Sequence, residues 1–319
     1  METTQQRKQL VMPVLLVVFA IALLVALNVF TGGKFLSASN LMNIVVNASV
    51  PIFVAWGFTF IFASGVTDLS VGAVIILAAN VAGTLGNAYG YAALVAGGVL
   101  TAVLLMSINF TVYQITRIPS WIAGLGMMML YEAVASFYAR YRLQSGLRVV
   151  TLETQYRALG QAPHVFVVIL LGFLLAYFLY NRTTIGLNIR ALGNNQGVAK
   201  TMGIPVAKTV ICSGLVAGIF IGIAAVVKES FAGTVNAVTG LSSLSTTFQP
   251  LAAVLMSHAL QRYINVSVAT LISTIFIMAV FNVLTLLGVS SGTWQETILG
   301  LSVIVFGVMA QKRTLGVVK

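Results

Sequence analysis

The sequence carries very little charge for its length. Of its 319 residues only 7% are charged, 59% are hydrophobic, and the mean hydropathy is +1.01. A soluble globular domain has about 25% charged residues. The single cysteine, Cys212, excludes an internal disulfide and a cysteine metal site, and the two histidines, His164 and His258, have no second ligand at metal spacing. The composition therefore predicts an all-α, polytopic membrane protein without a metal site.

Several catalytic motifs are also missing. The chain has no Gly-x-x-x-x-Gly-Lys-Ser/Thr phosphate loop, so any ATP hydrolysis must be supplied by another subunit. It has no His-Glu-x-x-His and no Gly-x-Ser-x-Gly sequence, so we do not expect an enzyme. No stretch outside the apolar runs is long enough for an independent core. We therefore predict that residues 1–319 form a single transmembrane domain.

Apolar runs of about 20 residues are long enough to cross a bilayer. The first run follows Arg7 and Lys8, exceeds the hydrophobic region of a signal peptide and lacks a small-x-small cleavage site, so we interpret it as a retained helix. The eighth is the weakest, because Gln249, Pro250 and His258 interrupt it, and we expect a broken or re-entrant element there. In total we predict about ten spans, near 9–30, 41–63, 70–87, 91–115, 119–139, 163–181, 206–228, 243–260, 264–287 and 294–311.

The cations indicate the orientation of these spans. The net charge of +11 lies in short clusters between apolar runs, which fits the positive-inside rule better than nucleic-acid binding. With the N-terminus inside, eleven of the 17 Lys and Arg residues lie on the cytoplasmic side. We therefore expect both termini and the polar segment 182–208 in the cytoplasm, and loop 140–162 on the opposite side.

Asp68 is the most informative single residue. It lies in the sequence Gly65-Val-Thr-Asp-Leu-Ser-Val-Gly72, between two apolar runs with almost no polar linker. A carboxylate inside the membrane is tolerated where it caps a helix or faces a water-filled cavity. The two glycines allow a chain break, and Asp68 or Ser70 can accept hydrogen bonds from the amides that open the next helix. Both the capping role and a place on a translocation path stay open.

A few other polar side chains within the spans are candidates for the same path. Glu132 either pairs with Arg140 or Arg142 or lines an outward vestibule. Span amides can bind a polar solute, although hydrogen bonding between helices is their commoner use. A tryptophan can stack on a sugar ring or simply pack. The candidates for the translocation path are Asp68, Asn47, Asn80, Trp121 and Glu132.

The polar segment 182–208 contains signals for a short helix. Asn194 or Asn195 can cap its start, Gly203 suits the position after its end, and Pro205 follows. Val198 and Met202 would share one face at i,i+4 spacing. Because about two turns are too few to be stable alone in water, we expect this helix to dock against something.

Five stretches in order carry a resemblance to a known family: Phe35-Leu-Ser-Ala-Ser-Asn-Leu-Met-Asn-Ile, the Gly65–Gly72 motif followed by Ala73, Ile118-Pro-Ser-Trp-Ile-Ala-Gly-Leu-Gly-Met, Ala191-Leu-Gly-Asn-Asn with Ala199-Lys-Thr-Met-Gly-Ile-Pro-Val, and Trp294-Gln-Glu-Thr-Ile-Leu-Gly-Leu. The sequence resembles the permease subunits of bacterial ABC importers for monosaccharides, the ribose type, over nearly its whole length. This resemblance implies a bacterial inner-membrane protein built from two pseudo-repeated halves.

The resemblance also implies partners and a role for segment 182–208. The short helix is similar to the family's coupling helix, which docks into an ATPase subunit that binds ATP and Mg²⁺, while the permease itself holds no cofactor. A second permease, membrane lipid and a periplasmic or lipid-anchored solute-binding protein complete the implied assembly. The residues implied in ATPase coupling are Arg190, Asn194, Asn195, Val198, Lys200, Met202 and Gly203.

One departure from the family pattern leaves alternatives open. Met256, Ser257 and the run Gln261-Arg262-Tyr263 stand where the family has glycines. Either this permease forms half of a heterodimer whose partner keeps the glycines, or its solute differs from ribose. Rival functions are an ion-coupled secondary transporter that uses Asp68, an ABC permease for nucleosides or a furanone-type signal, and a membrane scaffold.

Overall fold

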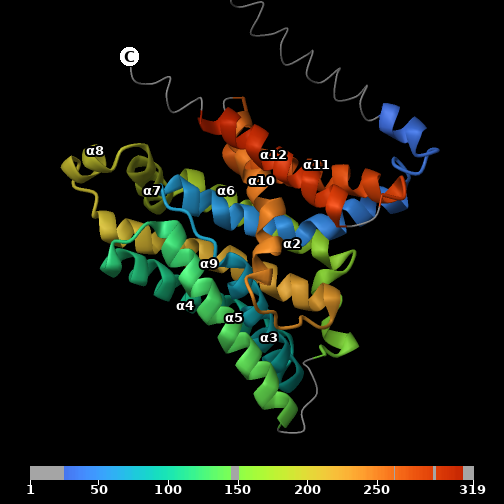
Figure 1. Cartoon of the computed structure of the whole chain (residues 1–319), viewed down its shortest axis with the longest axis horizontal. Coiled ribbons are helices and arrows are strands. Elements are labelled where there is room, and N and C mark those ends of the chain that lie inside the picture. Colours follow the sequence, from blue (N-terminus) through green and yellow to red (C-terminus); the bar gives the residue numbers. More distant parts are fainter. Residues whose placement is uncertain (1–24, 145–150, 262, 290–291, 312–319) are drawn as a thin grey trace, which may run out of the picture.

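In the computed structural model, the described residues are 25–144, 151–261, 263–289 and 292–311. The described part consists of helices and connecting turns (Figure 1). The long helices are α2 (Ala38–Ala63), α3 (Val71–Tyr89), α4 (Tyr91–Thr116), α5 (Ser120–Gln144), α6 (His164–Arg182), α9 (Val206–Ala232), α10 (Ser245–Leu260), α11 (Val266–Leu286) and α12 (Thr293–Gln311). The short ones are η1 (Thr154–Tyr156), η2 (Ala158–Gly160), α7 (Thr184–Asn194), α8 (Gln196–Thr201) and η3 (Ser242–Leu244).

Seven of the described helices are long and apolar enough to cross a membrane: α2, α3, α4, α5, α6, α9 and α11. The element expected at 243–260 is shorter, because η3 precedes a 16-residue α10 that contains Pro250. The apolar part of α12, Trp294–Met309, is also shorter than a full span. Most of the expected first span lies outside the described residues. The prediction of an all-α polytopic membrane protein is confirmed, whereas the count of ten spans stays a prediction.

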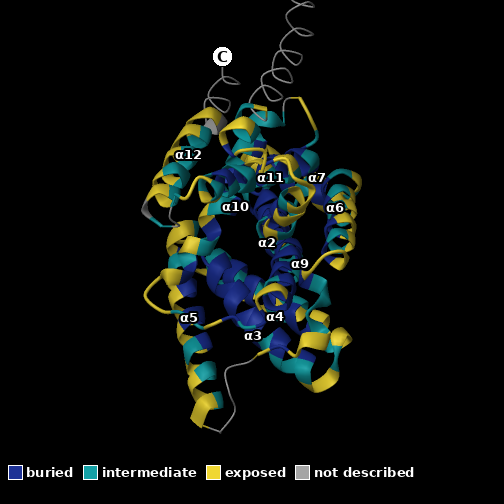
Figure 2. Ribbon diagram, turned by 90° about the vertical axis from the view of Figure 1, so that its right-hand side faces the viewer, coloured by how far each residue is buried: buried dark blue, intermediate teal, exposed yellow. Residues whose placement is uncertain are grey.

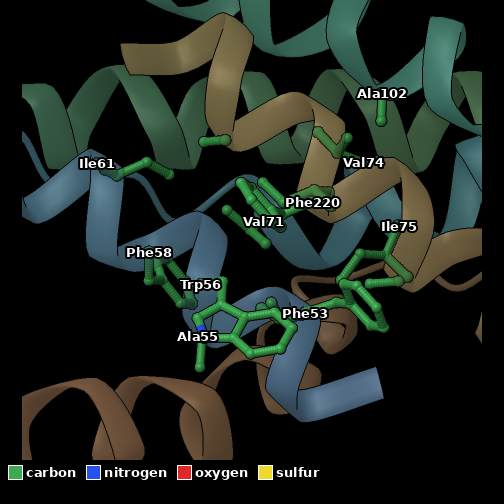
Figure 3. Packing of buried hydrophobic residues seen from close by; sticks show 14 of the residues in the cluster. Phe53, Ala55, Trp56, Phe58, Ile61, Val71, Val74, Ile75, Ala102 and Phe220 are labelled. Carbon is green, nitrogen blue, oxygen red and sulfur yellow. The ribbon is translucent and has the colours of Figure 1, made fainter. Parts of the chain in front are cut away.

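The centre of the molecule is formed by α2, α3 and α9, which are buried over most of their length, while α5, α6 and α12 expose one face (Figure 2). Trp56 of α2 lies in this core at 1% exposure, in edge contact with Phe53 at 5.4 Å between ring centroids and with Phe220 at 6.2 Å (Figure 3). Its indole nitrogen donates to the Ser267 carbonyl oxygen at 3.2 Å. Trp56 is therefore a packing residue.

Small residues bring α4 and α9 together. A Cβ at Gly218 would lie 2.7 Å from the Cα of Val103, and one at Gly222 would lie 2.5 Å from the Cα of Val99. Helix backbones approach this closely only where one side chain is a hydrogen atom. Gly218 and Gly222 of α9 thus pack against α4 inside the fold.

Candidate functional site

The short helix expected in segment 182–208 is present as α8. The Asn195 side-chain oxygen accepts the Val198 N–H at 3.1 Å and so caps its start. Past its end, Gly203 adopts a left-handed φ of 80°, and the Ile204 N–H reaches the Ala199 carbonyl at 3.0 Å. Ala199 anchors the helix at 1% exposure.

The other face of α8 is apolar and open. Val198 is 52% exposed and Met202 is 72% exposed, although both are hydrophobic. Lys200 is exposed beside them. α8 therefore presents two neighbouring apolar side chains and one cation away from the bundle, on a segment outside the spanning helices.

A second helix, α7, precedes α8 and was not expected from the sequence. Its N-cap is Thr183, whose hydroxyl accepts the Gly186 N–H at 3.2 Å. Arg190 lies on α7, where its Nε donates to the Gly186 carbonyl at 3.2 Å and its guanidinium covers the Tyr180 ring at 5.1 Å. Arg190 therefore holds α7 against α6, while Asn194 is the last residue of α7. In Figure 1, α7 and α8 lie at the end of the bundle where α9 begins.

The corner between α7 and α8 lies directly against the end of α2. A Cβ at Gly193 would be 2.1 Å from the Ala63 carbonyl oxygen and 3.1 Å from the Gly65 nitrogen. Both neighbours are backbone atoms, so no side-chain rotation relieves this contact. The corner and the turn after α2 are thus in contact backbone to backbone.

Asp68 organises the break that follows this turn. It is 2% exposed, and its Oδ1 accepts the Ser70 N–H at 2.8 Å at the start of α3. Its Oδ2 accepts the Asn109 Nδ2–H of α4 at 2.6 Å, and Asn109 also donates to the Ser70 Oγ at 3.0 Å. A Cβ at Gly124 of α5 would lie 2.8 Å from the Asp68 Oδ1. The carboxylate therefore fastens the start of α3 to α4 beside α5.

Glu132 has a corresponding role at the second break, the turn that leads into η3 and α10. It is 3% exposed, and its two oxygens accept the Leu241 N–H at 3.0 Å and the Ser243 N–H at 2.9 Å. Of the two alternatives left open by the sequence, pairing with Arg140 or Arg142 is not supported, because both carboxylate oxygens accept backbone N–H groups at the start of η3. Glu132 thus holds the turn that opens η3 and α10, in which Leu241 has a left-handed φ of 66°.

The two broken elements touch each other. A Cβ at Gly72, in the first turn of α3, would lie 2.1 Å from the Ser243 carbonyl oxygen. Gly124, beside Asp68, and Glu132 are eight residues apart on α5, which corresponds to about 12 Å of helix. A continuous line of close contacts therefore runs from the α7–α8 corner through the Asp68 break to η3. We refer to these contacts, made at Gly193, Asp68, Gly72 and Glu132, as the contact line.

The other candidates for the translocation path are not brought together. Asn80 is buried on α3, where its Nδ2 donates to the Ile76 carbonyl at 2.8 Å. Asn47 is exposed on α2 and donates to the Asn43 carbonyl at 2.9 Å, and Trp121 is 51% exposed on α5. Of the five residues, Asp68 and Glu132 therefore belong to the contact line, and the other three do not.

Sequence reasoning missed the partners rather than the carboxylates. Asn109 was one of several span amides, and its own sequence neighbourhood gives no sign that it reaches Asp68 on another helix. Ser243 and Leu241 contribute only backbone N–H groups, which any residue has. Gly193 and Gly72 carried a weak signal, since a glycine next to a turn often marks a close backbone approach.

Comparisons with known proteins identify the family of this chain. A family model described as "Branched-chain amino acid transport system / permease component" matches residues 40–311. The ribose import permease protein of Escherichia coli is 27% identical over 306 residues, covering 92% of this chain and 92% of the relative. The fructose import permease protein of Rhizobium meliloti is 24% identical over 293 residues, covering 88% of this chain and 80% of the relative.

A third relative, the D-allose transport system permease protein of Escherichia coli, is 26% identical over 226 residues, covering 70% of this chain and 69% of the relative. No solved structure matches the chain. The family match spans most of the chain, and the helices of the described part include seven that are long and apolar enough to cross a membrane. The chain is therefore an integral membrane protein that belongs to the branched-chain amino acid transport system permease family.

Proposed function

We propose that this chain is the membrane permease subunit of an ATP-driven importer for a monosaccharide, and that α8 docks into its ATPase subunit. The observation that carries the proposal is the open apolar pair Val198 and Met202 on a capped helix outside the spanning segments. The relatives support the solute class, because their names specify ribose, fructose and allose. ATP and Mg²⁺ are bound by the partner ATPase, and a solute-binding protein delivers the sugar.

The placement of the turns supports the orientation that we propose for the chain. The ends of α2 and α4, the α7–α8 corner and the start of α9 line one common cavity, so they lie on the same side of the molecule. This side carries Arg117 and the cations of segment 182–208, which supports a cytoplasmic location for it. Both termini then lie in the cytoplasm of a bacterium, and the bundle of about ten helices spans its inner membrane.

The contact line supplies a mechanical connection from ATPase to gate. A displacement of α8 reaches the α2–α3 turn because Gly193 leaves no space against Ala63. Asp68 passes the displacement to the start of α3, and the Gly72–Ser243 contact passes it to η3 and α10. Broken helices inside membrane transporters occur where access to a central site is switched. We therefore place the gate where α3 and η3 meet, at the Gly72–Ser243 contact.

The ion-coupled alternative is not favoured. One relative is named an import permease and another an L-arabinose ABC transporter permease. Both oxygens of Asp68 are already engaged by Ser70 and Asn109. Permeases for nucleosides or a furanone-type signal are not favoured either, since the named relatives transport sugars.

The test is co-purification from the native membrane. A tagged wild-type chain is expected to recover an ATPase, and the double variant Val198→Asp/Met202→Asp is expected to lose it, since two carboxylates cannot enter an apolar groove without a large desolvation penalty. Thr184→Asp is the matched control, because it adds an exposed carboxylate at the start of α7 without touching α8. Absence of any ATPase from the wild-type eluate would sink the proposal.

A further inference from the structure

The contact line borders a large polar cavity that the proposed transport cycle does not use. The cavity has a volume of about 810 Å³ and lies between the end of α4, the turn after α2, the α7–α8 corner and the start of α9. Pockets that bind small molecules have volumes of about 300–1,000 Å³. Its polar lining residues are Ser64, Tyr113, Gln114, Arg117, Asn194, Asn195 and Gln196.

The lining has the chemistry of a site for a hydroxylated solute. It contains four side-chain amides, one guanidinium, one phenol and one hydroxyl, and no Asp or Glu lines it. Within the described part of the chain, Gln114, Asn194 and Gln196 make no side-chain hydrogen bond, so their donors and acceptors are free for a ligand. Side-chain amides both donate and accept hydrogen bonds, as the hydroxyl groups of a sugar do. Tyr113 adds an aromatic surface on which the apolar face of a sugar ring can stack.

Although Asn194 and Asn195 line the cavity, the apolar face of α8 that we assign to ATPase docking does not. Neither Val198 nor Met202 lines it, whereas Gly65 and Gly193 both do. A ligand there would contact both sides of the Gly193–Ala63 approach. It would therefore restrain the relative motion of the α7–α8 corner and the α2–α3 turn.

We propose that this cavity binds a monosaccharide, free or as its phosphate ester, on the cytoplasmic side, and that the bound sugar slows the transporter. The inference rests on the proposed function, because sugar import raises the concentration of such a solute on this side. Arg117 lies at the rim with a left-handed φ of 57° and supplies the only cation in the lining, which suits a phosphate ester as well as a neutral sugar.

The test measures binding and inhibition in the purified complex of the chain with its co-purified ATPase. Binding of radiolabelled D-ribose, D-galactose and their phosphate esters is followed by scintillation proximity. ATP hydrolysis by the complex is measured in the presence and absence of each sugar. The double variant Tyr113→Leu/Gln114→Leu removes the aromatic surface and one ligand amide, and neither residue is implied in ATPase coupling. Gln161→Leu, which changes an exposed amide in the loop between α5 and α6, is the matched control.

We expect binding of at least one sugar and inhibition of ATP hydrolysis in the wild type and in Gln161→Leu. The double variant should bind at least about tenfold more weakly while its uninhibited hydrolysis rate is kept. Arg117→Gln identifies the source: it weakens binding of a phosphate ester and leaves a neutral sugar unaffected. No binding to wild type, or equal binding to the double variant, would overturn the proposal.

The two proposals fail in different ways. If no ATPase co-purifies, the proposed function fails, and the same binding measurement on the chain alone still decides whether the cavity takes a sugar. If the ATPase is recovered and no sugar binds in the cavity, the proposed function stands and this inference is wrong.

Discussion

The sharpest prediction concerns Gly193, where the α7–α8 corner touches the end of α2. In Gly193→Ala the new Cβ would lie 2.1 Å from the Ala63 carbonyl oxygen and 2.8 Å from its carbonyl carbon. An ordinary contact needs about 3.5 Å, so the corner must move away by more than about 1 Å. Overpacking of this kind costs about 1–3 kcal/mol. We expect the contact line to be broken at its first step while α8 itself stays folded, since its caps lie at Asn195 and Gly203.

The assay compares docking with transport. Gly193→Ala should still recover the ATPase, because Val198 and Met202 are unchanged, but sugar uptake into vesicles should fall at least about tenfold, the rate equivalent of 1.4 kcal/mol. Gly126→Ala is the matched control, because a Cβ there has nothing within 4 Å. Uptake of Gly193→Ala equal to wild type would refute the mechanical connection, and loss of ATPase recovery would show that the corner serves docking instead.

Three further predictions test the rest of the contact line. Glu132→Gln replaces one carboxylate oxygen by an NH₂ group that faces the Leu241 or Ser243 N–H. The free energy of unfolding, measured by thermal unfolding in detergent, should fall by about 1–3 kcal/mol, and uptake should fall with it. Unchanged stability would contradict the capping role of Glu132. Asp68→Asn should keep most uptake activity, because Asn109 can turn its unpartnered Oδ1 toward the new side-chain amide. Asp68→Leu leaves the Ser70 N–H and the Asn109 amide without their acceptor, so it should lose both stability and uptake. Equal losses in the two variants would mean that the charge of Asp68 is needed. Gly72→Ala places a Cβ 2.1 Å from the Ser243 oxygen and should abolish uptake with ATPase recovery intact, and normal uptake would remove this contact from the account.

Much of the architecture follows from local signals in the sequence. The long apolar runs predict the spanning helices. The Asn195 cap together with Gly203 predicts the position of α8, which runs from Gln196 to Thr201. The element expected at 243–260 corresponds to η3 and α10, although Pro250 lies within the continuous α10 and does not interrupt it. Each of these depends on residues close together in the chain, where capping and hydropathy rules apply directly.

The remainder depends on contacts between distant segments. α7 was missed although Ile185, Ile189 and Leu192 recur at helical spacing, because the polar segment was interpreted as containing one short helix. The Arg190–Tyr180 contact holds α7 against α6. The sequence left two alternatives open for Glu132 and pointed to neither of its partners, because these lie more than a hundred residues away and are backbone N–H groups. Asn47 and Trp121 were chosen for side-chain type alone. Side-chain type does not indicate which face of a helix points into the bundle.

The most direct test of the contact line measures whether α8 and the α2–α3 turn move together. Spin labels at Thr201→Cys and Thr67→Cys, both exposed positions, in a Cys212→Ser background report their separation in the complex with the co-purified ATPase, and a third label at Gln155→Cys serves as reference. On ATP binding we predict that the 201–67 distance stays constant while both distances to 155 change by about 1–2 Å or more. A change in the 201–67 distance with no change between 67 and 155 would contradict the account, because α8 would then move without carrying the break at Asp68.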